Sequence, residues 1–357
     1  MKKLFLYAYD RRNLGDDLFV EYIAGRYPDA QFYIWSGAEN EAAYGSIPNL
    51  RRIDPDSRVV RLLRKLRPSL VARYRAWLEN RCDAVAYIGG SIFMEYPNWE
   101  TICTWWEYEA ANRPFYVLGA NFGPYHTEAY REKMQNIFRD CRDVCFRDKY
   151  SAGLFPGTVR YAPDILFGYE MPRVEIRENR VFVSAIDCTG RDEAHDLSRF
   201  DESYVKNMAA LLKTQLEQGK EITLASFCQA EGDERGIQKI LRALGTEENI
   251  RVLRYDGTNR QEMVTALAEA GLVIGTRFHA VVLALAAERP VIPVLYSDKT
   301  KHMLQDMGFG GPVVDLREEG NWDFDNPSVT AAAVTAPFTQ GSLGHFEKLD
   351  AVMGKRL

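Results

Sequence analysis

Three basic side chains stand just after apolar runs in the last third of the chain. Arg277 and His279 follow a run that ends at Ile274, and Lys299 follows the next run, which ends at Leu295. Parallel strands bring their carboxyl ends to one edge of a sheet, where ligands bind in open α/β proteins. The free N–H groups of a helix start favour an anion there, and a guanidinium can bind phosphate or carboxylate through two hydrogen bonds. The spacing therefore predicts an anion site beside an imidazole.

The same residues also admit a structural interpretation. An arginine at a helix start can bond a neighbouring loop, and a single histidine near an apolar helix is often a packed structural residue. Lys299 favours the functional interpretation, because the shared sheet edge would bring it near His279. Thr276 and Ser297 precede these basic residues and are expected to line the same site.

Small and polar residues also follow the strands expected in the first half of the chain. A glycine at a strand end lets a ligand approach the backbone closely, although Asn, Gly and Asp are also ordinary turn and cap residues. The candidates are Asn13, Gly15 and Asp16, then Gly89, Gly90 and Ser91, then Asn121 and Gly123, and Arg147.

Strand and helix patterns alternate along most of the chain. Strands are expected at 3–9, 31–35, 83–88, 115–118, 141–146, 159–162, 181–186, 222–227, 252–255, 272–274 and up to Leu295, and helices at 17–26, 203–218, 233–244, 261–269 and from about Phe278. This alternation predicts an α/β protein of two Rossmann-like, doubly wound domains facing across a cleft. The expected domains are 1–170 and 171–325, and 326–357 forms a tail whose helix would pack back across them.

Composition and charge limit which classes of partner and cofactor are expected. The chain has 357 residues, a net charge of −5, 46% hydrophobic and 27% charged residues, so a nucleic-acid partner is not expected. Its six cysteines include no CxxC pair, which favours a reducing cytoplasm, and no His, Cys or carboxylate cluster predicts a metal.

Two stretches keep two interpretations. The arginine-rich residues 51–81 predict amphipathic helices interrupted at Pro68, either as a solvated face or as a basic collar for an anionic substrate at a membrane surface. In the FCQAEGD stretch, Gln229, Glu231 and Asp233 could contact acceptor hydroxyls, but acidic residues at a helix start are the favoured interpretation.

Several short motifs occur together in a characteristic order: NLGDD (13–17), GGSIF (89–93), LGANFGP (118–124), FRDKYSAGL (146–154), APD (162–164), GTRFHA and LYSDKTKHML. In this order they resemble the polysaccharide pyruvyl transferase family, from the first strand to about Phe309. The resemblance implies a glycosyltransferase-B-like fold and transfer of the pyruvyl group of phosphoenolpyruvate onto two hydroxyls of one sugar. It places Arg147, Arg277, His279 and Lys299 in donor binding and catalysis, and it places Asp16 at an acidic position.

The residues fit this chemistry. Phosphoenolpyruvate carries a phosphate and a carboxylate, which Arg147 on one wall and Arg277 with Lys299 on the other could bind together. His279 is the candidate acid that protonates the enol methylene carbon, and Asp16 is the candidate base. No cofactor is expected besides the donor substrate. The expected acceptor is a glycan or a lipid-linked saccharide of capsule or exopolysaccharide synthesis, with peripheral association at the inner membrane face.

Two other functions stay open. A sugar-nucleotide glycosyltransferase of the same shape would use Arg277 and Lys299 to hold a diphosphate, and it would need an acidic residue such as Glu231 or Glu269 for the ribose. A non-catalytic module of polysaccharide assembly could keep the fold without turnover, although the intact basic residues argue against this alternative.

Overall fold

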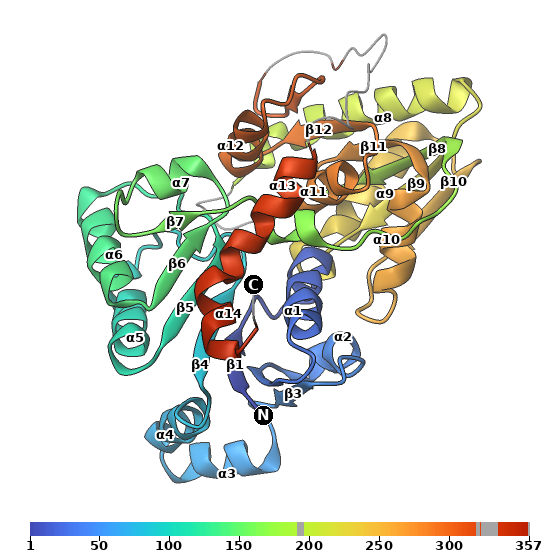
Figure 1. The fold of residues 1–357 in the computed structure, drawn as a ribbon. Coiled ribbons are helices and arrows are strands. Elements are labelled where there is room, and N and C mark those ends of the chain that lie inside the picture. The colour runs from blue at the N-terminus through green and yellow to red at the C-terminus, as the bar shows by residue number, and fades with distance from the viewer. Residues whose placement is uncertain (191–195, 319–321, 323–334, 356–357) are drawn as a thin grey trace. The chain divides into compact units, whose positions relative to one another are not determined.

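The structure is a computed structural model that describes residues 1–190, 196–318, 322 and 335–355 (Figure 1). It contains two compact units. The first unit comprises residues 1–12, 16–165 and 341–357, and the second comprises 13–15 and 166–340. Part of the expected tail, residues 326–334, 356 and 357, lies outside the described residues, whereas 341–355 belongs to the first unit.

The first unit is built on a parallel sheet with the strand order β3-β2-β1-β4-β5-β6-β7. Its strands are β1 (Lys3–Tyr7), β2 (Gln31–Trp35), β3 (Leu50–Ile53), β4 (Ala84–Ile88), β5 (Phe115–Ala120), β6 (Asp143–Phe146) and β7 (Arg160–Tyr161). The order reverses beside β1, which is the doubly wound pattern. Strand β5 is buried along its whole length, as expected for a parallel strand covered on both faces.

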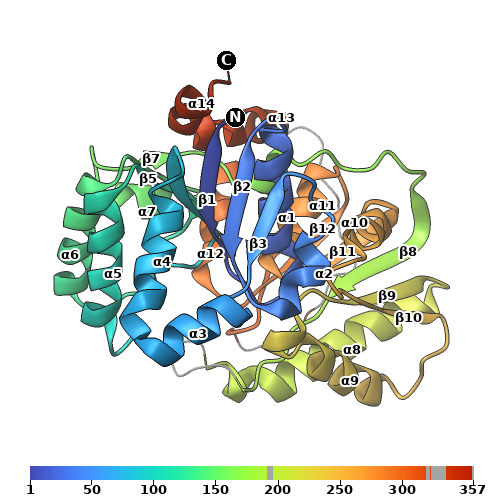
Figure 2. The same cartoon turned by 90° about the horizontal axis from the view of Figure 1, so that it is seen from below.

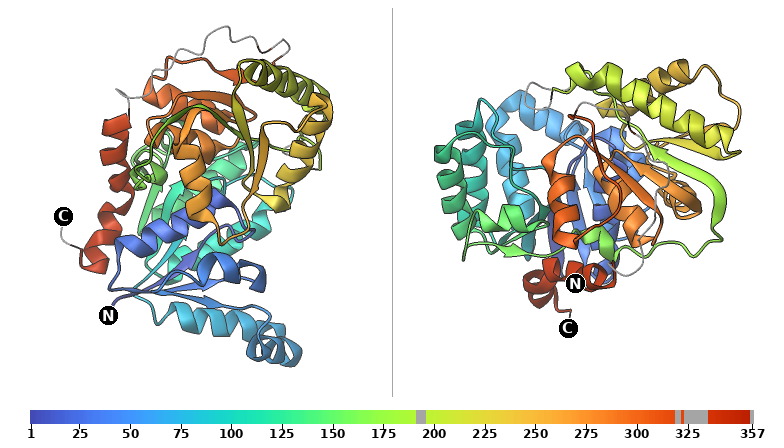
Figure 3. Two further views of the ribbon diagram at one scale, coloured as in Figure 1. Left: turned by 90° about the vertical axis from the view of Figure 1, so that its right-hand side faces the viewer. Right: turned by 90° about the horizontal axis from the view of Figure 1, so that it is seen from above.

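Helices cover both faces of this sheet (Figure 2). They are α1 (Leu14–Arg26), α2 (Glu41–Tyr44), α3 (Arg58–Leu66), α4 (Pro68–Glu79), α5 (Trp99–Asn112), α6 (Glu128–Asp140), α7 (Lys149–Gly153) and α14 (Glu347–Met353). On one face, Trp106 of α5 and Met134 of α6 pack in one core with Phe5, Val85 and Val117. On the other face, the last helix lies beside α1 (Figure 3), where Arg26 forms an ion pair with Asp350 at 2.6 Å.

The second unit repeats the design on a parallel sheet with the order β10-β9-β8-β11-β12-β13. The strands are β8 (Arg177–Ser184), β9 (Glu221–Ser226), β10 (Ile250–Arg254), β11 (Ala270–Gly275), β12 (Val291–Leu295) and β13 (Val314–Asp315). The helices are α8 (Asp201–Glu217), α9 (Asp233–Leu244), α10 (Arg260–Ala268), α11 (Phe278–Ala286), α12 (Asp298–Met307) and α13 (Thr335–Ser342), which leads back into the first unit. The apolar helix α11 is buried almost all round.

Several expected boundaries are wrong; strand β8, for example, begins at Arg177 rather than at 181. Helix α1 begins at Leu14 rather than at 17, because the NLGDD stretch itself enters the helix. Residues 51–53 form edge strand β3 instead of helix, because they pair with Tyr33 to Trp35 of β2. Strand β6 begins at Asp143 instead of 141, because helix α6 continues to Asp140.

Candidate functional site

In the second unit, the GTRFHA motif forms a tight connection from β11 to α11. Gly275 ends the strand, and an added Cβ there would lie 2.8 Å from Val281 Cγ2. The N–H groups of Thr276 and Arg277 donate to Ser184 Oγ at 3.0 and 3.1 Å. The Thr276 hydroxyl lies 3.2 Å from the hydroxyl of Tyr204. These bonds fix the turn, so Thr276 serves the local structure through its backbone and its side chain.

Arg277 is held by two carboxylates. Its Nε donates to Asp233 Oδ1 and Oδ2 at 3.1 and 3.0 Å, and its two Nη atoms contact Asp233 and Glu231. Burial lowers the pKa of Arg277, but these carboxylates outweigh burial and raise that pKa well above its usual value. Arg277 therefore stays cationic, at a fixed position, with 5% of its surface exposed.

The two carboxylates differ in how firmly they are held. Asp233 is fully buried and accepts hydrogen bonds of 2.9 Å from the N–H groups of Phe227 and Cys228. The side chain of Glu231 is 28% exposed. An incoming anion would therefore compete with Glu231 for Arg277 more easily than with Asp233, since displacing Asp233 would leave its buried charge without the guanidinium.

His279 is the second residue of α11 and is 9% exposed. Its ring stands edge-on to Phe278, with 5.2 Å between ring centroids. A Cβ added to Gly15 would overlap the imidazole, so the absence of a side chain at residue 15 makes room for His279.

The segment that carries Gly15 is tied to the second unit, although Arg12 and Asp16 on either side belong to the first. Asn13 bridges to Cys228, and Leu14 N–H donates to Phe227 O at 3.1 Å. The side chain of Asn13 accepts a bond of 3.1 Å from Gly15 N–H. Asn13 and Gly15 thus lie beside the loop that supplies Glu231 and Asp233.

Lys299 is in the first turn of α12, directly after β12. It is half-buried, and its Nζ lies 5.1 Å from the ring centroid of Tyr296. Ser297 is the N-cap residue of the helix but makes no side-chain cap bond. Because β11 and β12 are parallel neighbours, Arg277, His279 and Lys299 all follow carboxyl strand ends at one edge of the sheet.

In the first unit, Arg147 follows β6 and is 3% exposed. Its Nη1 donates to Asp164 Oδ2 at 3.1 Å, and its Nη2 donates to Asn121 Oδ1 at 2.6 Å. An added Cβ on Gly90 would lie 2.5 Å from Nη2, which is closer than a Cβ can stand. Gly90 therefore leaves the space that the guanidinium uses. Ser91 Oγ donates to the same Asn121 oxygen at 3.1 Å.

The two glycine turns of the first unit are joined to each other. Asn121 N–H donates to Gly90 O at 2.9 Å, and Gly123 N–H donates to Phe93 O at 2.8 Å. Gly123 has φ of +100°, which favours glycine. The structure thus brings together Gly90, Ser91, Asn121 and Arg147.

Asp16 lies in the first turn of α1 and is 9% exposed. Its Oδ1 lies 4.0 Å from the point where a Cβ of Gly89 would stand, so Asp16 and Gly89 are neighbours within the first unit.

Sequence reasoning missed the partners that hold both arginines. Asp233 was expected to act mainly at a helix start, and it does lie in the first turn of α9, but it also binds Arg277. Asp164 was noticed only as part of a short motif, and it binds Arg147. The available signal was that each carboxylate also follows a strand of the same sheet. Among the described residues, no group of three His, Cys, Asp or Glu side chains could hold a metal ion.

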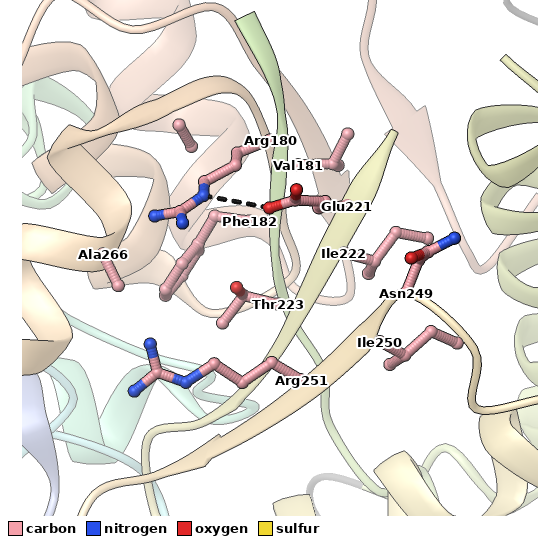
Figure 4. Close-up of a pocket in the computed structure, with 11 residues that line it drawn as sticks. Arg180, Val181, Phe182, Glu221, Ile222, Thr223, Asn249, Ile250, Arg251 and Ala266 are labelled. Atoms are coloured by element: carbon pink, nitrogen blue, oxygen red, sulfur yellow. Dashed lines mark hydrogen bonds and ion pairs between the residues drawn. The ribbon is translucent and has the colours of Figure 1, made fainter. Parts of the chain in front are cut away.

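A surface hollow of about 300 Å³ lies elsewhere in the second unit, at the amino ends of its strands (Figure 4). Arg180 and Arg251 line it, but both are compensated by carboxylates. Arg180 binds Glu221 and Glu269, and Arg251 binds Glu262. The predicted residues all follow carboxyl strand ends, so this hollow is separate from them.

Two parallel, doubly wound α/β units define a glycosyltransferase-B-like protein, and solved structures share this fold. A putative UDP-N-acetylglucosamine 2-epimerase from Listeria monocytogenes matches with a TM-score of 0.54 and 10% identity, over 99% of this chain and 90% of that one. UDP-GlcNAc 2-epimerase from Neisseria meningitidis matches with a TM-score of 0.54 and 11% identity, over 99% of this chain and 94% of that one. Anabaena HepE in complex with UDP-glucose matches with a TM-score of 0.52 and 14% identity, over 99% of this chain and 93% of that one.

The chain belongs to the polysaccharide pyruvyl transferase family, whose sequence model matches residues 13–298. This match confirms the resemblance of the motifs, and it ends one residue before Lys299. The amylovoran biosynthesis protein AmsJ from Erwinia amylovora is 22% identical in an alignment of length 261 that covers 66% of this chain and 62% of AmsJ. The chain thus spans less than two thirds of that relative. Among the described residues, no helix has the length and apolar character needed to cross a bilayer.

Proposed function

We propose that this chain transfers the pyruvyl group of phosphoenolpyruvate onto two hydroxyls of one sugar in a polysaccharide or its lipid-linked precursor. The products are a cyclic ketal and phosphate. Family membership and similarity to an amylovoran biosynthesis protein support this proposal. The observation that carries it is the start of α11, where a buried, permanently cationic Arg277 stands two residues from His279.

The donor is a small, multiply charged anion, and Arg277 is built to receive one. Asp233 fixes the guanidinium, and the more exposed Glu231 is the partner that the donor replaces. In the proposal, Lys299 of the same unit contacts the donor together with Arg277, and Arg147 keeps the donor-binding role that family membership suggests. A fixed guanidinium suits a phosphate or a carboxylate, since each anion accepts two parallel N–H bonds.

The proposed reaction has two additions at one carbon. His279 gives a proton to the methylene carbon of the donor, so C2 becomes an electrophile. A sugar hydroxyl then bonds to C2 and loses its proton to Asp16 as base. Phosphate then leaves with the C–O bonding pair, the second hydroxyl bonds to C2 in its place, and the proton of that hydroxyl passes to His279, which restores the acid as the ketal closes. In this scheme, the acceptor is met in the cytoplasm at the inner face of the membrane.

The direct test uses purified protein, phosphoenolpyruvate and a panel of lipid-linked and synthetic glycosides. We expect phosphate release together with a new ketal methyl signal by NMR, and a thermal shift with phosphoenolpyruvate. A thermal shift and sugar transfer with nucleotide sugars, without ketal formation, would instead establish a glycosyltransferase.

His279→Gln tests the acid. We expect this variant to keep donor binding and to lose turnover, because glutamine cannot deliver the proton. The control is His126→Gln, which alters an exposed histidine of the first unit. Full turnover in His279→Gln would remove the imidazole from the mechanism.

A further inference from the structure

Helix α3 of the first unit exposes large apolar side chains in a regular stripe. Val59, Leu62 and Leu66 are 59%, 59% and 63% exposed. Their spacing of three and four residues places them on one side of the helix. Val60 is the buried residue of the helix. Single exposed apolar residues are common, but three of them aligned on nine residues form a surface that suits an apolar partner.

Cations occupy another side of the same helix. Arg58, Arg61, Arg64 and Lys65 are all exposed, and α3 contains no acidic residue. Arg64 pairs with Asp56 at 3.0 Å. Within the described part of the chain, Arg58, Arg61 and Lys65 have no ion-pair partner. This concentration of positive charge stands out in a protein whose net charge is −5.

The next helix adds an aromatic group. Helix α4 follows α3 after Arg67, and its Trp77 is 50% exposed. The guanidinium of Arg81 lies 4.3 Å from the centroid of this ring, and Tyr74 stacks on it at 6.0 Å. In Figure 1, α3 and α4 lie at one end of the first unit. Tryptophan and arginine together are typical of surfaces that meet lipid headgroups.

We propose that α3 docks the first unit onto an anionic lipid surface. The stripe of Val59, Leu62 and Leu66 would enter the boundary between headgroups and acyl chains, and the unpaired cations would contact the lipid phosphates. Charge selects this partner over a symmetric pair of copies, because in such a pair the cations of α3 would face the same cations of the second copy. Docking requires neither donor nor turnover, so it stands independently of pyruvyl transfer.

The test is sedimentation of the full-length protein with vesicles of phosphatidylcholine alone, or of phosphatidylcholine mixed with phosphatidylglycerol. We expect binding to the mixed vesicles, weakening as salt rises, and little binding to the neutral ones. Arg61→Glu with Lys65→Glu should weaken binding at least roughly tenfold, since each cation near the surface contributes roughly fivefold. Leu62→Ser with Leu66→Ser should also weaken binding. These substitutions should leave the fold intact, because both side chains are exposed.

The matched control is Lys206→Glu with Lys213→Glu, which makes the same charge change at two exposed lysines of α8 in the second unit. It should bind like the unaltered protein. Equal loss in this control would overturn the proposal, because net charge alone would then explain the binding. Absence of binding to the mixed vesicles would also overturn it. So would a change of oligomeric state in the Leu62 and Leu66 variant with vesicle binding intact, because that result assigns the stripe to a second copy.

Discussion

Arg277 and its two carboxylates show how one side chain can be both fixed and available. Asp233 binds the guanidinium from a fully buried position, whereas Glu231 contacts it from a partly exposed one. The two acids therefore have different expected effects on a reaction with an anionic donor, and the difference can be measured.

Asp233→Asn should lower kcat/KM for phosphoenolpyruvate roughly 100-fold, because it breaks a buried ion pair and frees the guanidinium to move. Glu231→Gln should lower KM for the donor, roughly threefold to tenfold, because the donor no longer competes with a carboxylate. Steady-state kinetics separate the two effects. Glu234→Gln is the control, since Glu234 pairs with Arg254 instead. An equal rise of KM in both variants would show that Glu231 is not displaced by donor.

Gly90→Ala tests the space beneath Arg147. The new methyl group would overlap the guanidinium, so we expect loss of activity and a destabilisation of about 1–3 kcal/mol. Gly25→Ala in α1 is the matched control, because an added Cβ there meets nothing within 4 Å. It should stabilise the protein by about 0.5–1 kcal/mol. Denaturant unfolding and turnover are measured for both variants. Equal stability and equal turnover of the two variants would refute the steric argument.

The sequence allowed prediction of which residues follow strand ends, but not of which carboxylates hold the arginines. Asp233 and Glu231 are separated from Arg277 by 44 and 46 residues. They meet because β9 and β11 both border β8, which strand order decides and residue spacing does not.

At the scale of elements, His345 links the last segment of the chain to the central sheet of the first unit. Its Nδ1 accepts a bond from Gly119 N–H at 3.3 Å, so Nε2 carries the proton and donates to Pro163 O at 2.9 Å. The neutral ring satisfies both contacts, whereas a second proton would place two N–H groups against each other. Burial lowers the pKa of His345 to about 3.

This low pKa predicts how stability depends on pH. An unfolded histidine has a pKa of about 6.5, so below that pH the unfolded chain takes up a proton that the folded first unit does not. Above about pH 6.5, protonation of this histidine should therefore not lower the free energy of unfolding. Below that pH, the free energy of unfolding should fall by at most about 1.4 kcal/mol per pH unit.

Urea unfolding of His345→Gln at several pH values tests this prediction. Removing the ionisable group should flatten the loss between pH 6.5 and 4.5, whereas the exposed His126→Gln should not. Parallel slopes for His345→Gln and the unaltered protein would contradict the assignment.

Elements with strong patterns were predictable. Helix α9 coincides with its expected range of 233–244, and Pro68 separates α3 from α4. Strand β3 was missed because its arginines pattern like an exposed helix, and only its pairing with β2 makes it a strand.

At the scale of the whole molecule, the first unit is made from separate parts of the chain. Residues 341–357 return to it after the second unit is complete. Phe346 and Leu349 are fully buried there, and Asp350 accepts bonds from Arg26 and Tyr27. The segment that begins at residue 341 thus completes the core on the α1 side of the sheet.

Ending the chain after Gln340 should destabilise the first unit by several kcal/mol, since two fully buried apolar side chains and an ion pair are lost. Hydrogen exchange should show loss of protection in β1, β4 and β5, with β8, β9 and β11 little changed. Ending it after Gly354 is the control, because residues 341–354 keep both buried side chains. Unchanged protection of β1 in the shorter chain would show that the tail is dispensable.

The return of residues 341–357 also sets an order of assembly during synthesis. By the time the ribosome has added residue 316, every strand of the second sheet exists, while the unit that began first still lacks its closing piece. The apolar surface around Tyr27 stays uncovered until Phe346 emerges. A nascent chain that stalls in this interval would expose an unfinished core to its neighbours, so aggregation would begin from the portion that was made earliest.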